Sequence, residues 1–123
     1  MGYTNYWYQY RDFTVDEWDE ITLFYDLHIV TNHSSYPSIK DLTDNSDCIK
    51  FDGDFGGTCE TFVLNRYEPK PRYEGDKTYF NFCKTQQLPY DDVVWKLLKF
   101  IKCVVLEPST KDFIISNDNG VEI

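Results

Sequence analysis

Two kinds of hydrophobic pattern divide the chain into segments with different expected structures. Along residues 3–11 the side chains alternate between two sets, and a period of two predicts a β-strand. Asn5 and Trp7 fall in one set, and tyrosines dominate the other. We therefore expect a strand with aromatic side chains on both faces, and Asn5 on the same face as Trp7.

A helix is expected over residues 14–30. Thr14 and Glu17 have the spacing of a capping box, in which each side chain bonds the backbone amide of the other residue. Acidic residues crowd the first turns, where the helix dipole favours them. Hydrophobic residues recur every three or four positions, and the expected buried stripe is Val15, Trp18, Ile21, Tyr25 and either His28 or Ile29.

The middle of the chain is expected to form a loop and a hairpin. Residues 31–47 are mostly polar and include Pro37, so we expect a surface loop there. Residues 48–55 and 58–66 are extended runs on either side of a Gly-Gly pair, which favours a tight hairpin turn.

The last third of the chain contains the strongest helical pattern. Residues 79–85 alternate as a strand, and Pro89 suits the first position of a helix. Hydrophobic residues then recur at helical spacing from Val93 to Val105, and residues 113–116 form a last short strand. Three lysines are expected on the opposite, solvent-facing side of this helix: Lys96, Lys99 and Lys102.

The expected order of elements is strand, helix, three strands, helix, strand (βαβββαβ). Each helix has one hydrophobic face that needs a sheet to cover it. We therefore predict an α+β fold, a two-layer sandwich in which two helices cover one face of a mainly antiparallel sheet of about five strands. The length of 123 residues, without internal repeats or a linker, predicts a single domain, residues 1–123.

The negative charge of the chain is concentrated in its first half. Residues 1–60 contain twelve acidic and three basic residues, and residues 61–123 contain nine of each, so the formal charge of −9 belongs to the first half. We expect no direct binding to nucleic acid or to a membrane, because both need a basic surface. The acidic half either binds a basic protein partner or forms a face that only aids solubility. The acidic partner surface would comprise Asp16, Glu17, Asp19, Glu20, Asp41, Asp44 and Asp47.

Other sequence features exclude several classes of protein. The four cysteines are widely spaced and form no CxxC motif, which disfavours a zinc site, and we expect neither a metal nor a cofactor. The sequence shows no secretory signal and no membrane span. We therefore expect a cytoplasmic protein with reduced cysteines, in the host cytoplasm if the source is a virus.

Polar and aromatic side chains are densest where the strand 79–85 meets the following helix. Polar groups at a strand end beside a helix N-terminus can hold an anionic ligand, and an aromatic ring can stack on a base. The candidate ligand-binding residues are Asn5, Trp7, Glu60, Lys84, Thr85, Tyr90 and Asp91. The structural alternative is a Lys84–Asp91 ion pair that only fixes the connection.

Catalysis has weaker support in the sequence. Asp52, Glu60 and Asp91 are candidate acids or bases, and Cys83 beside Lys84 would be a nucleophile if its pKa were depressed. The chain contains no GxSxG, HExxH or P-loop motif, and we assign no catalytic residue.

Several segments together resemble one family. The start MGYTNYW, the middle FDGD followed by ETFVL, the run FNFCKTQQLPYDDVV and the late ISNDNG resemble small bacterial, phage and large-virus proteins that begin MGYTHYW and carry an FCKT…PYD motif. This chain has Asn5 and Cys59 where that pattern has histidine. The resemblance assigns no catalytic residue to the chain.

Three functions are consistent with these features. The leading hypothesis is a non-enzymatic protein, of phage or viral origin, that binds a small nucleotide-like ligand at the Lys84–Asp91 junction with Trp7 and so sequesters a host defence signal. The second is an acidic inhibitor that imitates nucleic acid and occupies a basic host protein. The third is a small hydrolase-like enzyme. A concave pocket lined by Lys84, Tyr90 and Trp7 would support the first hypothesis, whereas a filled junction would favour the second. A sequestering protein is often a homo-oligomer, and tyrosines of the first strand would then form the contact.

Overall fold

Six strands and two helices make up the part of the chain that the computed structural model describes, residues 2–30, 39–54, 56–67, 73–75 and 79–123. Each helix continues into a π-helical segment. The α+β class predicted from the sequence is confirmed. In order, the elements are β1 (Thr4–Gln9), α1 (Val15–Tyr25), η1 (Asp26–Val30), β2 (Ile39–Asp41), β3 (Cys48–Gly53), β4 (Phe62–Asn65), β5 (Phe80–Lys84), α2 (Asp91–Phe100), η2 (Ile101–Val105) and β6 (Phe113–Asn117).

The strands form two antiparallel sheets instead of the single sheet that the sequence predicted. One sheet has the strand order β5-β1-β6, and the other has the order β2-β3-β4. β2 falls within the stretch 31–47, which was expected to be loop throughout, and positions 31–38 of that stretch lie outside the described residues. The short strand IKD was missed because three residues are too few to show a period.

β1 is the central strand of its sheet and is aromatic on both faces, as predicted. Trp7 faces the core and packs against Phe62 of the other sheet, with ring centroids 5.0 Å apart. On the outer face, Tyr6 stacks on Phe80 of β5 at 6.0 Å. One face of β1 therefore packs against the core, and the other face contributes to a row of aromatic rings.

One backbone hydrogen bond and several side-chain hydrogen bonds link the two sheets, where no backbone ladder between β4 and β5 is found in the described residues. At one end, the backbone N–H of Glu60 donates to the carbonyl oxygen of Lys84 (2.9 Å), and the Glu60 carboxylate accepts from the Lys84 N–H (2.8 Å). At the other end, buried Gln9 donates from Nε2 to the carbonyl oxygens of Asn65 (3.1 Å) and Arg66 (3.2 Å). These bonds satisfy backbone groups that a continuous six-stranded sheet would have paired.

The connection from β3 to β4 is longer than the tight hairpin that the Gly-Gly pair suggested. β3 ends at Gly53 and β4 begins at Phe62, so the two-residue turn is wrong. Gly56 and Gly57 still carry out the bend, since their φ angles are +101° and +103°, a region that other residues rarely adopt.

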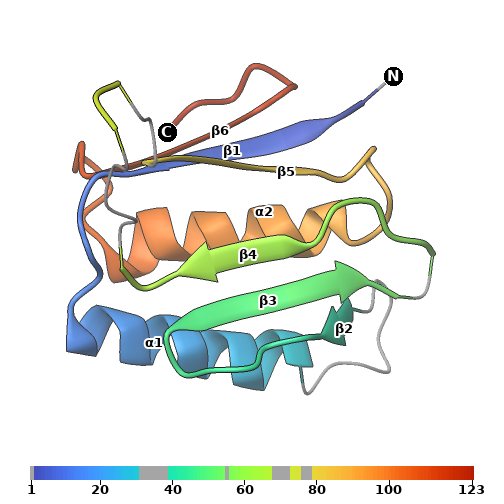
Figure 1. Ribbon diagram of the computed structural model, residues 1–123, viewed down its shortest axis with the longest axis horizontal. Coiled ribbons are helices and arrows are strands. Elements are labelled where there is room, and N and C mark those ends of the chain that lie inside the picture. The colour runs from blue at the N-terminus through green and yellow to red at the C-terminus, as the bar shows by residue number, and fades with distance from the viewer. Residues whose placement is uncertain (1, 31–38, 55, 68–72, 76–78) are drawn as a thin grey trace.

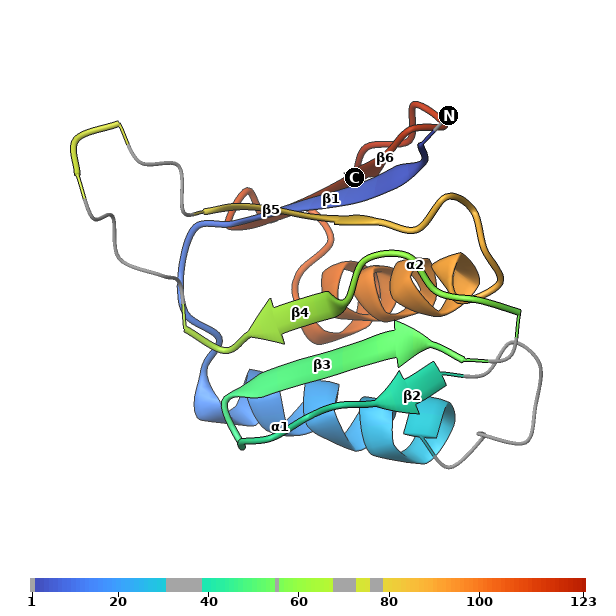
Figure 2. The same cartoon turned by 45° about the vertical axis from the view of Figure 1, so that its right-hand side comes forward.

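Both helices lie on the same side of the molecule. Figure 1 and Figure 2 show α1 and α2 next to one another, with β3 and β4 in front of them and the β5-β1-β6 sheet above α2. Phe24 of α1 stacks on Phe100 of α2 with centroids 3.9 Å apart. The predicted layer of helices against sheet is therefore present, although the sheet is divided.

α1 begins as the sequence predicted. Thr14 Oγ1 accepts from the Glu17 N–H (3.1 Å) and Glu17 Oε1 accepts from the Thr14 N–H (2.8 Å), which confirms the capping box. Val15 was expected in the buried stripe but is 58 % exposed. The other members of that stripe are buried: Trp18, Ile21, Tyr25 and Ile29.

The π-helical end of the second helix changes which side chains face the core. A π-helical turn spans five residues, so it rotates the following side chains away from their α-helical positions. Lys102, expected in solvent, is only 3 % exposed, and its ammonium group donates to the carbonyl oxygens of Thr110 (2.6 Å) and Phe113 (2.7 Å). Val104, expected in the core, is 66 % exposed.

Candidate functional site

The junction that the sequence marked as a ligand pocket is filled by its own side chains. Trp7 and Tyr90 are each 1 % exposed, and neither ring is accessible for stacking on a ligand. The Tyr90 hydroxyl donates to the carbonyl oxygen of Glu60 (2.8 Å) and accepts from the Cys59 N–H (3.1 Å). Burial raises the pKa of this hydroxyl. The pocket expected between Lys84, Tyr90 and Trp7 is therefore not formed.

Lys84 takes no part in the predicted ion pair. Its side chain is exposed, and its ammonium group lies 5.8 Å from the centroid of the Phe82 ring. The ion pairs of the described residues do not include Lys84 or Asp91. The Lys84–Asp91 ion pair is therefore wrong, because β5 directs the lysine to the outer face of its sheet while Asp91 lies on the helix side.

Three of the other predicted residues do come together. Asp91 Oδ1 accepts a hydrogen bond from Asn5 Nδ2 and another from Thr85 Oγ1 (2.6 Å). Asn5 and Thr85 are fully buried, whereas Asp91 is half-buried. Asn5 Oδ1 is a buried acceptor for which no described residue supplies a donor. The network ties the start of α2 to β1 and to the end of β5, and it fixes the Asp91 carboxylate.

Cys83 is not an activated nucleophile. The thiol is fully buried and donates weakly to the Glu60 carbonyl oxygen (3.5 Å). Burial, followed by the charge of Glu60, raises the pKa of Cys83 to about 12. At neutral pH the group is a thiol, so the depressed pKa on which covalent catalysis would depend is absent.

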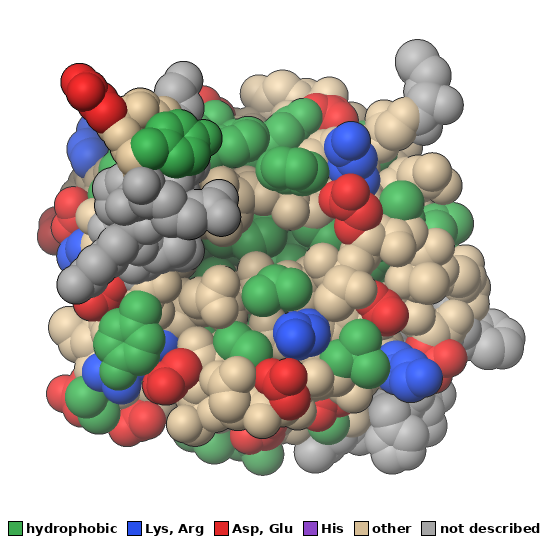
Figure 3. Space-filling view, in the orientation of Figure 1, with side chains coloured by type: hydrophobic (Ala, Val, Ile, Leu, Met, Phe, Trp, Pro, Cys, Tyr) green, Lys and Arg blue, Asp and Glu red, His purple; other side chains and the backbone are tan. Residues whose placement is uncertain are grey.

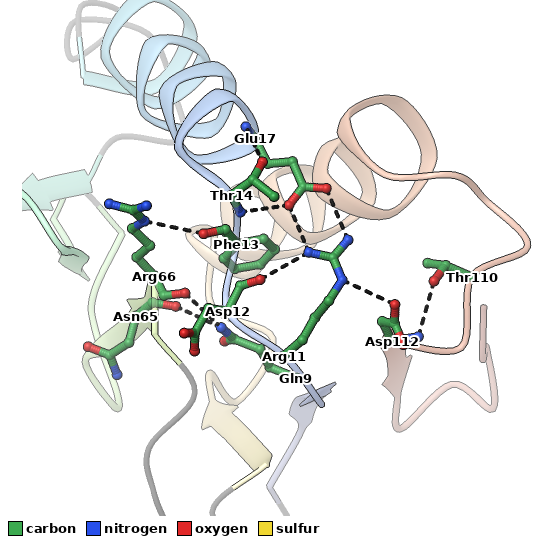
Figure 4. Close-up of polar contacts among 10 residues, drawn as sticks. All are labelled: Gln9, Arg11, Asp12, Phe13, Thr14, Glu17, Asn65, Arg66, Thr110 and Asp112. Carbon is green, nitrogen blue, oxygen red and sulfur yellow. Dashed lines mark hydrogen bonds and ion pairs between the residues drawn. The ribbon is translucent and has the colours of Figure 1, made fainter.

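The predicted acidic surface divides into paired and unpaired carboxylates. Figure 4 shows the Arg11 guanidinium between Glu17, which it contacts through two nitrogens (2.8 and 3.0 Å), and Asp112 (3.1 Å). The bonds from Arg11 hold the pKa of Glu17 below its usual value. Asp44 lies 3.6 Å from Lys50.

The remaining acidic residues of the predicted surface have no cation within ion-pair distance in the described part of the chain. Asp16, Asp19 and Glu20 are exposed on α1, and Asp47 is exposed before β3. Asp41 accepts from the buried Tyr25 hydroxyl (2.7 Å). These carboxylates face solvent, with no cation beside them in the described part of the chain.

A groove between α1 and the β2-β3 hairpin collects part of this charge. It has a volume of about 350 Å³, and Asp19, Asp26 and Asp41 are among the side chains that line it. Asp26 was not among the residues predicted for the acidic surface, although its spacing of seven residues from Asp19 places both on one helix face. By contrast, Figure 3 shows that the face in front of β3 and β4 mixes basic, acidic and hydrophobic side chains.

Other features bear on metals and membranes. No group of three or more His, Cys, Asp or Glu side chains among the described residues is arranged to hold a metal ion. Within the same residues, no helix has both the length and the hydrophobicity needed to cross a membrane. Comparisons of the chain with protein families, with curated proteins and with solved structures found no match. The family resemblance noted in the sequence therefore stays a prediction.

Proposed function

We propose that the protein is a non-enzymatic binding domain whose acidic surface around α1 binds a basic protein partner in place of a nucleic acid. One observation carries this proposal: among the described residues, Asp16, Asp19 and Glu20 of α1 have no cation within ion-pair distance. The filled Lys84–Asp91 junction supports the same choice, because it removes the pocket on which the small-ligand hypothesis was based.

The few cations of the first half have little effect on this surface. Arg11 is shared between Glu17 and Asp112, and Lys50 lies beside Asp44. The exposed carboxylates of α1 would attract a basic surface over a distance of about 10 Å at ordinary salt. Such steering raises the association rate and suppresses acidic or neutral partners.

The spacing of the carboxylates suits imitation of a phosphate backbone. Five acidic residues lie between Asp16 and Asp26, a stretch that is about 15 Å long at the helical rise of about 1.5 Å per residue. The four intervals between these residues average about 3.8 Å along the helix axis, comparable to the roughly 3.4 Å per phosphate along one DNA strand, and Arg11 offsets the charge of one of the five, Glu17. A protein surface that binds phosphates with lysine and arginine would therefore meet a comparable line of charge.

The groove beside α1 offers a place for a basic side chain of the partner. Asp19, Asp26 and Asp41 lie around it, and the Tyr25–Asp41 hydrogen bond fixes one of these carboxylates. A lysine or arginine that enters the groove would form charge-assisted hydrogen bonds, which are stronger than neutral ones.

The test is affinity capture from a lysate followed by measurement of the dissociation constant for the captured protein. We compare the wild-type chain with a triple variant, Asp16→Asn, Asp19→Asn, Glu20→Gln, at low and high salt. A partner bound through this surface should be basic, should be released at about 0.5 M salt, and should bind the variant about tenfold or more weakly, because each exposed charge contributes about 0.5–1 kcal/mol.

A matched control separates this surface from net charge. The variant Glu74→Gln, Glu107→Gln, Glu122→Gln removes the same number of charges from exposed positions in the second half. Equal losses for the two triple variants would show that only net charge matters. Binding that is indifferent to salt, or absence of any stoichiometric partner, would contradict the proposal.

A further inference from the structure

We propose a second, independent site for a small ligand in a groove beside the first turns of α2. The groove has a volume of about 540 Å³ and lies between α2, the start of β1 and the turn after β6. It is distinct from the filled junction, with which it shares only Asp91. It is also distinct from the acidic surface, since it contains no residue of α1.

One wall of the groove presents a fixed carboxylate. Oδ1 of Asp91 is held by the buried donors of Asn5 and Thr85, and no described residue donates to Oδ2. Asp92 follows it and is exposed in the same groove. A carboxylate whose orientation is already determined loses little entropy on binding, so this end suits hydroxyl or amino donors of a ligand.

Further along α2, the same wall is basic. Lys96 and Lys99 are exposed, line the groove, and form no described ion pair. The Lys96 ammonium group lies 5.9 Å from the centroid of the Phe24 ring of α1, so it would move from that ring to meet a ligand in the groove. They lie five and eight residues after Asp91, which is about 7.5 and 12 Å along the helix axis at about 1.5 Å per residue. The two lysines therefore suit an anionic group of the ligand that lies about 7.5–12 Å from the hydroxyl or amino groups that donate to Asp91.

Aromatic and amide groups complete the groove. Trp95 is half-buried and lies between the acidic and basic ends in sequence, and its ring offers a surface for a flat ring of the ligand. Asn117 and Asn119 line the groove from the turn after β6. Tyr3 lies just before β1, where burial and the charge of Asp91 raise the pKa of its hydroxyl.

These groups together select one chemical class, a nucleoside phosphate. Its sugar hydroxyls suit Asp91 and Asp92, its phosphate suits the two lysines, and its base suits Trp95. A free sugar would bind only the acidic end, and inorganic phosphate would bind only the basic end. The sugar therefore tests the acidic end by itself, and phosphate tests the basic end.

Tryptophan fluorescence gives a direct assay. Trp7 and Trp18 are buried, so Trp95 is the tryptophan among the described residues that a ligand in the groove would contact. We titrate the full chain with AMP, GMP, CMP, UMP and their diphosphates, and with ribose and inorganic phosphate as the two half-ligands. The expected result is saturable quenching by at least one nucleotide, which Trp95→Phe abolishes.

Substitutions then test each end. Asp91→Asn, which can keep an oxygen toward Asn5 and Thr85, should weaken nucleotide binding about tenfold, and Lys96→Gln with Lys99→Gln should weaken it about tenfold or more and reduce its salt dependence. Lys84→Gln, at an exposed lysine outside the groove, should leave binding unchanged. Thermal unfolding of each variant confirms that it is folded.

The proposal is overturned if no nucleotide quenches the fluorescence or raises Tm at millimolar concentration. It is also overturned if Lys84→Gln weakens binding as much as the groove substitutions do, or if inorganic phosphate binds as tightly as every nucleotide. The groove contains no residue of α1, so a negative result in these experiments would not contradict the proposed binding of a protein partner.

Discussion

Tyr90 provides a sharp test of the claim that the junction is core and not a pocket. We consider Tyr90→Phe, which removes one oxygen and keeps the ring that fills the space. Gly53 lies against this ring so closely that an added Cβ would be 2.7 Å from Tyr90 Cδ1. The ring of the variant should therefore stay in place, and the effect should come from the hydroxyl alone.

The expected size of the effect follows from the three hydrogen bonds that the hydroxyl makes. It donates to the Glu60 carbonyl oxygen at 2.8 Å, with a longer contact to the Lys84 carbonyl oxygen at 3.3 Å, and accepts from the Cys59 N–H at 3.1 Å. The Lys84 carbonyl oxygen keeps its bond from the Glu60 N–H when the hydroxyl is removed. A buried backbone group left without its partner costs about 1–3 kcal/mol. Since the Glu60 carbonyl keeps a weak bond from Cys83, we expect a loss of about 2–3 kcal/mol in the free energy of unfolding.

The assay is urea and thermal unfolding of Tyr90→Phe, with Tyr73→Phe as control because Tyr73 is 66 % exposed. At about 3–5 °C per kcal/mol for a chain of this size, Tm should fall by about 6–15 °C, and the control should change by less than about 2 °C. A raised tyrosine pKa also makes the folded state lose stability as pH rises above the ordinary value of 10.0, and the variant should lose less. Equal Tm values for Tyr90→Phe and the wild type would refute the core assignment.

Three further substitutions test the fold. In Arg11→Gln the free energy of unfolding, measured by urea titration, should fall by about 1 kcal/mol at pH 7. The difference in stability from the wild type should disappear as the pH drops below the usual Glu17 pKa of 4.5, because a carboxylate with a depressed pKa contributes stability only above that range. A difference that stays constant down to pH 2.5 would contradict this. Lys102→Ala should lower stability by about 2–4 kcal/mol by calorimetry, since two carbonyl groups lose a charged donor, and an unchanged Tm would show that the lysine is solvated. Gly53→Ala should destabilise the chain by about 2 kcal/mol or more in the same experiment, because its Cβ has no room, and wild-type stability would contradict the packing around Tyr90.

Local patterns in the sequence predicted the elements well. The capping box at Thr14 has the expected bonds, and β1 and β5 lie within the segments that alternate. These features depend on neighbouring residues, so a single sequence contains the information for them.

Features that depend on distant contacts were not predictable in the same way. A π-helical turn moved Lys102 into the core and Val104 out of it, and nothing in the spacing of the hydrophobic residues indicates such a turn. The two sheets are linked by Gln9 and Glu60, which bond backbone groups of residues more than twenty positions away in the sequence.

The candidate site shows the same contrast. Asn5, Thr85 and Asp91 were selected from the sequence and are hydrogen-bonded in the structure, because strand alternation and helix start both place polar groups there. The burial of Tyr90 was not predicted, because an aromatic residue before a helix can face either the core or the solvent. The sequence does not show that Gly53 leaves room for the Tyr90 ring.

Competition with DNA tests the central claim most directly. The captured partner is bound to fluorescent double-stranded DNA, and the wild-type chain is added at low salt. The proposed imitation of phosphates predicts that the chain displaces the DNA at one equivalent per site, and that Asp16→Asn, Asp19→Asn, Glu20→Gln displaces it about tenfold less well. A stable complex containing partner, DNA and chain together would contradict the proposal.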